Sequence, residues 1–429
     1  MQVQDILTTD FRRGDAPGGF FMTCDKFMDA RRISLVDNRY RVPFVLVTSL
    51  FFLWGFAHAI LDVLNKHFQE VLEISKAHSA LVQATMYMGY FIMAIPAGLF
   101  IARFGYRKGV VFGLLLYGVG SLLFIPGQHF GSFNAFLFAL FVIGCGLTFL
   151  ETAANPYVTE LGARETAASR LNLAQSFNGV GCICAPMVAG LLLFSGDGAE
   201  VSGGNVALPY ACMGVVVFVV AVVFSRVKLP EIGHAVETDT EGHRVGLWSH
   251  KMFIFGLAAL LAYEIAEISI NSFFINYVVE QRWMNERHAS LFLAFGGLGL
   301  FMAGRFVGSW IMQRVRAEKM LFCCATGTLV TTTLVLLNVG YVSLAALLCG
   351  YAFEAIMFPT IFALSLKGLG CHTKRASSFL MMSPVGGVIG PLLMGWVADS
   401  ATMVIAFTVP LAGYAVVWLY AHRTLSLQK

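Results

Sequence analysis

Residues 150–178, LETAANPYVTELGARETAASRLNLAQSFN, contain the pattern on which the fold assignment depends. They continue the apolar run FLFALFVIGCGLTFL (136–150), which contains no acidic or basic residue. Glu151 and Asn155 are four residues apart and share a helical face, and Pro156 removes a backbone donor. Placing these groups in hydrocarbon costs several kcal/mol unless they line a wet or protein-lined cavity. The stretch therefore predicts a polar cavity inside a membrane-spanning bundle.

The composition is typical of a polytopic membrane protein. Of the 429 residues, 57% are hydrophobic and 13% are charged, whereas a soluble domain carries about 25% charged residues. The net charge of +4 does not suggest a nucleic-acid partner. The nine cysteines lie mostly in apolar segments and lack the spacing of zinc ligands, so we expect neither a metal site nor disulfides.

The length of the apolar segments predicts twelve transmembrane helices, because a hydrocarbon core about 30 Å thick needs about 20 residues per helix. The predicted spans are 43–65, 79–102, 109–126, 134–158, 170–194, 208–227, 251–279, 289–312, 320–338, 341–366, 376–397 and 401–421. We expect an all-α protein with an amino-terminal tail, a six-helix bundle, a linker, a second six-helix bundle and a carboxyl-terminal tail, at 1–40, 41–227, 228–250, 251–422 and 423–429.

Basic residues are distributed unequally between the two sides of these spans. Assigning the tails and the even-numbered connections to one side places 24 of the 29 Lys and Arg residues there, against four on the other side. Cytoplasmic loops carry such an excess, so we expect both tails in the cytoplasm. Arg103, Arg107 and Lys108 lie in the turn between the second and third spans, where we expect them to latch helix ends on the cytoplasmic side.

The two halves of the chain repeat a motif. Glu151-x4-Pro156 recurs as Glu354-x4-Pro359, each followed by a polar loop that contains Leu-Gly. Two six-helix halves related by an axis along the membrane normal are typical of the major facilitator fold, whose binding site lies between the halves near the midplane. The repeat therefore predicts pseudo-twofold symmetry and a central site.

Residues of the first span suit a sugar. Trp54, His58 and Asp62 follow one another at four-residue intervals on one helical stripe. Aromatic faces pack on the C–H groups of sugars, while polar side chains pair with their hydroxyls. Asp62 has an alternative interpretation as a solvated or capping carboxylate at the outer mouth, since it lies late in the span.

Glu151 is the candidate proton carrier. Burial favours the neutral form of a carboxyl group, so Glu151 would bind a proton and release it when the cavity hydrates. Its alternative role is structural, bonded to a neighbouring helix. Asn155, Gln175 and Asn178 follow in the same stretch and are the candidate partners of sugar hydroxyls.

The second half supplies further ionisable residues. Glu264, Glu267 and Asn271 share one face of the seventh span; we expect Glu267 to line the cavity, and Glu264 to do so or to act only in helix packing. Arg305 is either a cavity cation that pairs with these carboxylates or an arginine that reaches the cytoplasmic interface. Glu354 is either a cavity or gating charge or a buried structural carboxyl.

Several motifs resemble one family, the fucose–galactose–hexose:proton symporters of the bacterial major facilitator superfamily. They are FFLWGFAHAILDVLN (51–65), MGYFIMAIPAG (88–98), LETAANPYVTELG (150–162), RLNLAQSFN (170–178) and MFPTIFALSLKGLG (357–370). The resemblance implies proton-driven uptake of a neutral monosaccharide by alternating access in the bacterial inner membrane.

The resemblance also assigns roles to residues. It implies that Asp62 and Glu151 are the protonation pair, that Gln175 and Asn178 lie at the sugar site, and that Arg305 matches an arginine in a Gly-Arg-Phe motif of the eighth helix. Positions 58 and 59 are His-Ala where fucose-transporting members have two asparagines.

The functional hypothesis is a sugar:proton symporter that acts as a monomer in the lipid bilayer, with the proton as coupling ion and no other cofactor. We expect substrate contacts from Gln175, Asn178, Asn155, His58, Glu267 and Trp54. A uniporter or exchanger on the same fold is one alternative. A non-transporting sugar sensor is another, although the tails and linker offer little room for an output domain. We do not expect an enzyme, because no nucleophile–base pair occurs in the spans.

Overall fold

The computed structural model describes residues 35–71, 76–193, 207–227, 229–230 and 246–427. For residues 60–71, 76–80, 83, 186–193, 286–287 and 371 the structure describes the backbone only. Most of the predicted 1–40 tail and of the 228–250 linker therefore lies outside the described residues. The described helices all belong to one unit of the chain, Ile33–Lys429.

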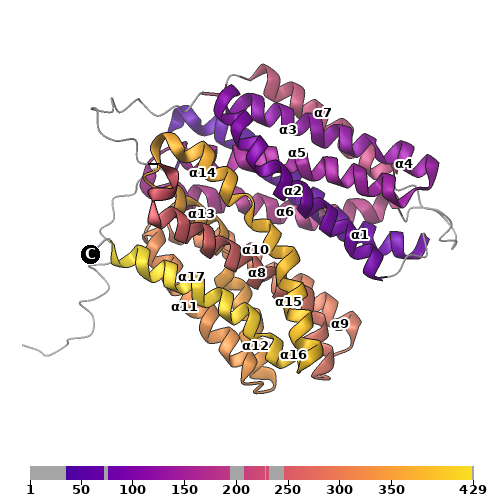
Figure 1. The fold of residues 1–429 in the computed structure, drawn as a ribbon, viewed down its shortest axis with the longest axis vertical. Helices are drawn as coiled ribbons and strands as arrows, with labels where there is room; N and C mark the ends of the chain where they lie inside the picture. Colours follow the sequence, from indigo (N-terminus) through magenta and orange to yellow (C-terminus); the bar gives the residue numbers. More distant parts are fainter. Residues whose placement is uncertain (1–34, 72–75, 194–206, 228, 231–245, 428–429) are drawn as a thin grey trace, which may run out of the picture. The chain divides into compact units, whose positions relative to one another are not determined.

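Apolar helices follow one another along the first half of the chain, drawn from indigo to magenta in Figure 1. The α-helices are α1 (Arg41–Val71), α2 (Lys76–Phe104), α3 (Tyr106–Leu122), α4 (Phe124–Phe130), α5 (Phe133–Glu160), α6 (Ala167–Leu193) and α7 (Ala207–Arg226). Short 3-10 turns precede α1 and α6, at η2 (Asn38–Tyr40) and η3 (Arg164–Thr166).

The second half contains shorter helical pieces, drawn from red through orange to yellow in Figure 1. The α-helices are α8 (Lys251–Glu280), α9 (Glu286–Leu291), α10 (Leu298–Ile311), α11 (Ala317–Leu336), α12 (Tyr341–Glu354), α13 (Met357–Leu366), α14 (Thr373–Leu380), α15 (Gly386–Ser400), α16 (Met403–Ala406) and α17 (Thr408–Ser426). Between them lie the π-helical segment η5 (Phe292–Gly297) and the 3-10 turns η4 (Leu247–Ser249), η6 (Gly370–His372) and η7 (Ser383–Val385).

The all-α prediction is confirmed. In the part of the chain that the structure describes, eleven helices are long and apolar enough to cross a membrane. The predicted span 170–194 coincides with α6. Some predicted spans consist of consecutive pieces, such as 341–366, which is α12 followed by α13. Local breaks of this kind leave the apolar window intact, and hydropathy alone does not detect them.

Helices of each half pack mainly on one another. In the first half α1 packs on α6, and α3 packs on both α5 and α7; in the second half α8 packs on α15 and α17, and α11 on α12 and α17. Contacts between the halves join α6 to α10 and α13, and α14 to α2 and α5. The pairs that join the halves therefore bring the glutamate-bearing α5 and the amide-bearing α6 against the second half.

One end of the bundle carries most of the basic residues, and we call it the basic end. It comprises the ends of α2, α5, α7, α10, α13 and α17 and the starts of α1, α3, α6, α8, α11 and α14. Lys374 of α14 lies over the Tyr106 ring of α3 there, 5.0 Å from its centroid. The predicted orientation assigns the basic end to the cytoplasm.

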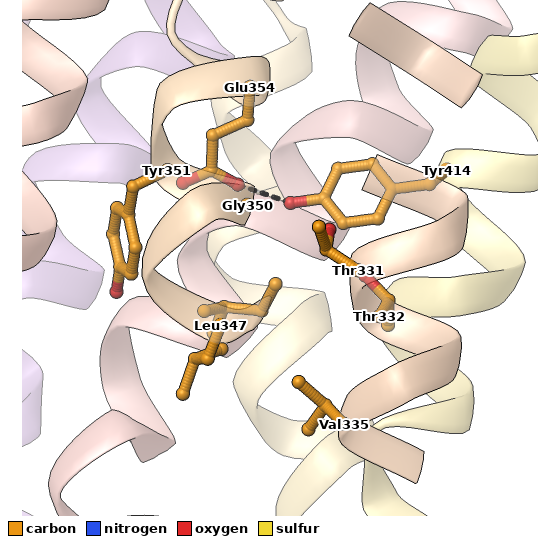
Figure 2. A pocket seen from close by; sticks show the side chains of 9 residues that line it. Thr331, Thr332, Val335, Leu347, Gly350, Tyr351, Glu354 and Tyr414 are labelled. Atoms are coloured by element: carbon orange, nitrogen blue, oxygen red, sulfur yellow. Dashed lines mark hydrogen bonds between the residues drawn. The ribbon is translucent and has the colours of Figure 1, made fainter. Parts of the chain in front are cut away.

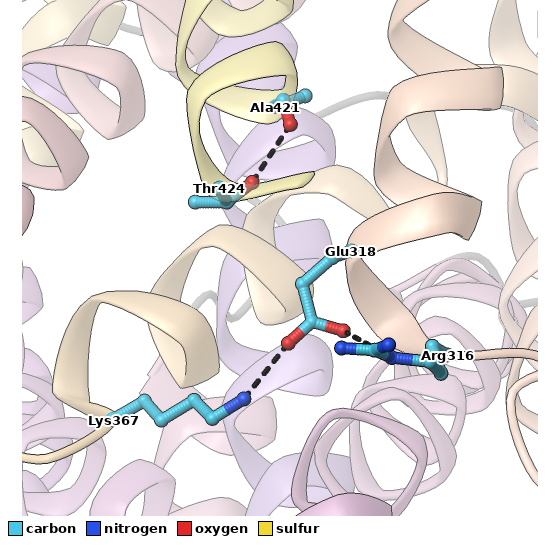
Figure 3. A network of polar contacts seen from close by, with 5 residues as sticks. All are labelled: Arg316, Glu318, Lys367, Ala421 and Thr424. Atoms are coloured by element: carbon cyan, nitrogen blue, oxygen red, sulfur yellow. Dashed lines mark hydrogen bonds and ion pairs between the residues drawn. The ribbon is translucent and has the colours of Figure 1, made fainter. Parts of the chain in front are cut away.

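An ion-pair network connects elements of the second half at the basic end (Figure 3). Glu318, in the first turn of α11, is buried, and its Oε1 accepts a hydrogen bond from Lys367 Nζ at 2.9 Å. Arg316 Nε lies 3.8 Å from Glu318 Oε2. A carboxylate in the first turn of a helix also interacts favourably with the helix dipole. The network therefore fixes the α13–α14 connection against α11.

Candidate functional site

A chain of three polar side chains crosses the core of the first half. Tyr90 of α2 donates a hydrogen bond to Glu151 Oε1 on α5, and both side chains are buried. His58 Nε2 on α1 lies 3.1 Å from the same Tyr90 hydroxyl. A hydroxyl can donate to one neighbour and accept from another, so Tyr90 connects the imidazole to the carboxyl group.

Amide groups lie one helical turn from Glu151. Asn155 is buried on α5, and its Oδ1 accepts from Gln175 Nε2 on α6 at 3.5 Å. Asn155 Nδ2 points to Met381 Sδ of the second half, also at 3.5 Å. The amide–amide contact is weak because it is long, and the contact to Met381 is weak because a thioether sulfur is a poor acceptor. The amides are therefore held in place but remain able to exchange these partners for better ones.

A buried guanidinium completes this cluster from the second half. Arg305 Nη1 on α10 donates to the backbone carbonyl and to Oε1 of Gln175, at 3.2 and 3.4 Å. Its Cζ lies 4.4 Å from the centroid of the Phe301 ring. Arg305 is only 7% exposed. Arg305 is therefore a buried cation that contacts both halves, and its role in a cavity stays a prediction.

Two prolines explain further contacts. Pro156 lacks the N–H that would bind the Thr152 carbonyl four residues earlier, and Ser377 Oγ of α14 donates to that carbonyl at 3.2 Å. Pro359 likewise leaves the Ala355 carbonyl free, and Arg305 Nε donates to it at 3.2 Å. Both carbonyls directly follow the repeated glutamates. The proline of each repeat thus supplies an acceptor that a side chain from another helix uses.

Polar pairs continue from the cluster toward the basic end. Asn172 Nδ2 on α6 donates to Thr360 Oγ1 on α13 at 3.1 Å. Ser169 Oγ donates to the Ser309 carbonyl at 2.6 Å, and Ser309 Oγ donates to the Ser169 carbonyl at 2.8 Å. In the described part of the chain, the side-chain hydrogen bonds between the halves lie between the basic end and this cluster. The halves are therefore joined on the basic side of the cluster.

The second half contributes three further carboxyl groups. Glu264 is buried on α8 against Gly386, and Glu267 on the same helix is half-buried. The charges of Glu264, Glu267 and Glu354 each interact with that of Arg305, and the charge of Glu151 interacts with that of Glu264. One guanidinium therefore interacts with several carboxyl groups, and it cannot balance the charge of all of them at once.

Glu354 lies apart from the amide cluster, inside the second half. It lines a small pocket formed by α8, α11, α12 and α17, and Figure 2 shows its carboxyl group directed toward Tyr414. Tyr414 donates a hydrogen bond to Glu354 Oε2, and Tyr263 donates to the Glu354 carbonyl at 3.3 Å. The Glu354 side chain turns into its own bundle, and both predicted roles, a cavity or gating charge and a buried structural carboxyl, stay predictions.

The remaining predicted substrate residues have different surroundings. Asn178 is half-buried on α6, where its backbone carbonyl approaches Gly55 of α1 so closely that a Cβ on Gly55 would lie 2.0 Å from the oxygen. Trp54 is buried and stacks on Phe51 of its own helix, with ring centroids 5.1 Å apart. Asp62 falls on α1, but its side chain lies outside the described residues.

The predicted latch residues contact mainly their own half. Arg107 donates to the backbone carbonyls at the end of α7, those of Phe224 and Ser225. Arg103 and Lys108 lie over the Phe104 ring, at 5.3 and 5.7 Å from its centroid. These contacts secure the α2–α3 turn, which stays a candidate latch.

Sequence reasoning missed the tyrosines. Tyr90 and Tyr414 each donate to a buried glutamate, and neither was a candidate. Their signal was faint, because a tyrosine in an apolar span has the same appearance as any aromatic core residue. A buried tyrosine hydroxyl needs a partner, however, and a lone carboxyl in a neighbouring span is a suitable one.

Known proteins share both the sequence and the fold. A family model described as Major Facilitator Superfamily matches residues 44–378. A glucose/galactose transporter of Brucella abortus biovar 1 (strain 9-941) is 34% identical over 389 residues, covering 90% of this chain and 94% of the relative. An L-fucose-proton symporter of Escherichia coli (strain K12) is 33% identical over 414 residues, covering 90% and 94%.

A solved structure shows the same architecture. The major facilitator transporter FucP, crystallised in the outward conformation, superposes with a TM-score of 0.79 at 32% sequence identity, covering 89% of this chain and 98% of FucP. The similarity agrees with the joined basic end described above. The comparisons confirm the family resemblance and the twelve-helix fold that the motifs predicted.

Proposed function

Because the chain belongs to the major facilitator superfamily, we propose that it carries a neutral monosaccharide and a proton together across the membrane. The two named relatives transport glucose and galactose or L-fucose. We propose a hexose or 6-deoxyhexose as the substrate. We also propose that the chain spans the bacterial inner membrane with its basic end in the cytoplasm, as the distribution of Lys and Arg indicates.

One observation carries this proposal: a hydrogen-bonded buried carboxyl lies one turn from weakly paired amides at the junction of the halves. Glu151 and Asn155 are four residues apart on α5, and Asn155 contacts Gln175. Amides donate and accept, which matches the mixed character of sugar hydroxyls. A protonation site and a sugar site on one helical face permit each ligand to affect the other.

The proposed mechanism uses these groups in turn. With the halves joined on the basic side, the sugar enters from the opposite side and replaces the weak amide contacts of Asn155 and Gln175. Protonation of Glu151 removes a charge that would be costly to enclose when the cavity closes. Tyr90 donates to Glu151 in either protonation state, and His58 connects that pair to the cavity. Separation of the halves at the basic end then releases sugar and proton.

Glu151→Gln tests the proton role, because it keeps the shape and removes the titratable group. In proteoliposomes with an inward proton gradient we expect the unsubstituted chain to accumulate sugar and to alkalinise the outer medium. The Gln variant should neither accumulate sugar nor move protons, yet should still exchange labelled for unlabelled sugar. Glu280→Gln, at an exposed position that ends α8, is the matched control and should behave as the unsubstituted chain.

Each alternative gives a distinct result. Accumulation that survives in Glu151→Gln excludes Glu151 as the proton carrier. Equilibration of sugar without alkalinisation in the unsubstituted chain contradicts symport and indicates a uniporter. A panel of D-glucose, D-galactose, L-fucose, D-mannose and N-acetylglucosamine as competitors identifies the preferred sugar; competition by none of them would contradict the proposed substrate class.

A further inference from the structure

We propose that Glu354 is a second proton-binding site, filled through its own pocket in the second half and not through the Glu151 site. The inference rests on the proposed symport and extends it to two protons for each sugar. Its basis is the geometry around the Glu354 carboxyl group, which differs from that of a carboxyl buried only for packing.

Among the described residues, one oxygen of this carboxyl group has no hydrogen-bond partner. Oε2 accepts from Tyr414, whereas Oε1 is buried and, within the described residues, forms no hydrogen bond. An unsatisfied buried acceptor is costly, so Oε1 needs a partner that the described side chains do not supply. Glu354 is 1% exposed and lines the pocket. A water molecule in that pocket would be a suitable partner for Oε1.

The pocket has the size and position for such a water. It offers room for about one water molecule. Gly350 lies one turn before Glu354 on α12, and its missing side chain leaves the space beside Thr331 open. The pocket extends to Val335, one residue before α11 ends at Leu336 on the side opposite the basic end. The proposed proton path therefore runs through this pocket toward that side and does not include the amide cluster.

The surrounding charges permit Glu354 to lose its proton. The titratable and charged groups whose charges interact with that of Glu354 come from α8, α10, α12 and α17: Tyr263, Glu267, Arg305, Tyr351 and Tyr414. Glu264 interacts with Glu267 and Arg305. Arg305 is the one cation among them and bonds to the carbonyl of Ala355, the next residue. A carboxylate at Glu354 is balanced when Glu264 and Glu267 stay protonated. Glu354 can thus hold or release its proton without leaving an uncompensated charge in the bundle.

The repeat supports an equivalent role for the two glutamates. Glu151 and Glu354 each precede the proline of the repeat, and each accepts from a tyrosine of a neighbouring helix, Tyr90 or Tyr414. Tyrosine can donate to the neutral or the charged carboxyl group, so neither site needs to rearrange on proton loss. The same carboxyl–tyrosine unit occurs once in each half.

The coupling ratio tests the proposal. Proteoliposomes at equal pH are given a tenfold higher sugar concentration inside, and potassium diffusion potentials are varied until net sugar flux is zero. A tenfold ratio balances about 59 mV for one charge and about 30 mV for two. We expect about 30 mV for the unsubstituted chain and about 59 mV for Glu354→Gln. Asp399→Asn, an exposed carboxyl at the end of α15, is the control and should stay at about 30 mV.

Gly350→Val gives an independent test that keeps the carboxyl group. A Cβ at Gly350 would lie 3.5 Å from Thr331 Oγ1, an ordinary contact, and the methyl groups of valine would take up space in the pocket. We expect its balancing potential to move toward about 59 mV. An unchanged potential in this variant would overturn the pocket as the proton path.

Other results refute different parts of the scheme. A balance at about 59 mV in the unsubstituted chain, or at about 30 mV in Glu354→Gln, would overturn the second proton while leaving symport intact. A flux in the unsubstituted chain that no potential balances would refute symport itself, and this inference with it.

Discussion

The reciprocal bond between Ser169 and Ser309 permits a direct test of how the basic end is held closed. Each hydroxyl donates to the backbone carbonyl of the other residue, at 2.6 and 2.8 Å. Alanine at both positions removes the two donors and favours the helices. Hydrogen bonds between transmembrane helices average about 0.6 kcal/mol, and buried bonds in proteins about 1 kcal/mol. The double variant should therefore lose about 1–2 kcal/mol from the closed state, or about 5- to 30-fold in the ratio of closed to open molecules.

Distance measurements across the basic end can detect this shift. Spin labels at Glu165 and Gln313 occupy exposed positions on opposite halves beside Ser169 and Ser309, in a background without reactive cysteines. Pulsed electron resonance should show a larger fraction of long distances in the double alanine variant. Thr424→Val is the control, because the Thr424 hydroxyl donates at 2.8 Å to the Ala421 carbonyl within α17, at the same end (Figure 3).

The refuting result is a distance distribution in the double variant that matches that of the unsubstituted chain. Single variants refine the test. Since the two bonds share one contact, the combined effect of both substitutions should differ from the sum of the single effects. Strict additivity would mean that the serines act independently, against the geometry.

Two further substitutions probe other contacts. Tyr90→Phe removes the donor to Glu151 at constant shape, so proton-driven uptake should fall about tenfold or more while sugar exchange persists. The control is Tyr117→Phe, at another buried tyrosine of the first half, which should leave initial uptake rates unchanged. Equal uptake rates in the two variants would contradict a role of Tyr90 in proton coupling. Lys367→Met breaks the ion pair with buried Glu318 and should lower the Tm by about 2 °C at low salt; a loss that high salt does not reduce would contradict an electrostatic origin.

Local patterns were sufficient to predict the helices and the burial of Glu151. A window of about 20 apolar residues has few stable alternatives to a membrane helix. A single carboxyl group at the end of such a window needs a polar partner, and Glu151 accepts a hydrogen bond from Tyr90. Both conclusions depend on the order of residues along one segment, which the sequence states directly.

Pairings between distant segments could not be predicted in this way. Tyr90 lies 61 residues from Glu151, and Ser169 lies 140 from Ser309. Which hydroxyl meets which acceptor depends on how the helices are placed and rotated. Glu354 illustrates this most clearly, because its repeat position matches that of Glu151 although its side chain turns into a pocket of its own half.

The proline-freed carbonyls have a consequence for the motion of the molecule. When the halves part at the basic end, the Thr152 carbonyl loses Ser377, and entering water can hydrate it at once because no amide hydrogen competes. Separation of the halves thus replaces the Ser377 donor at the Thr152 carbonyl with a water molecule. A swap between two partners of similar strength keeps the end states close in free energy, which a carrier that must return to its starting form on every cycle requires.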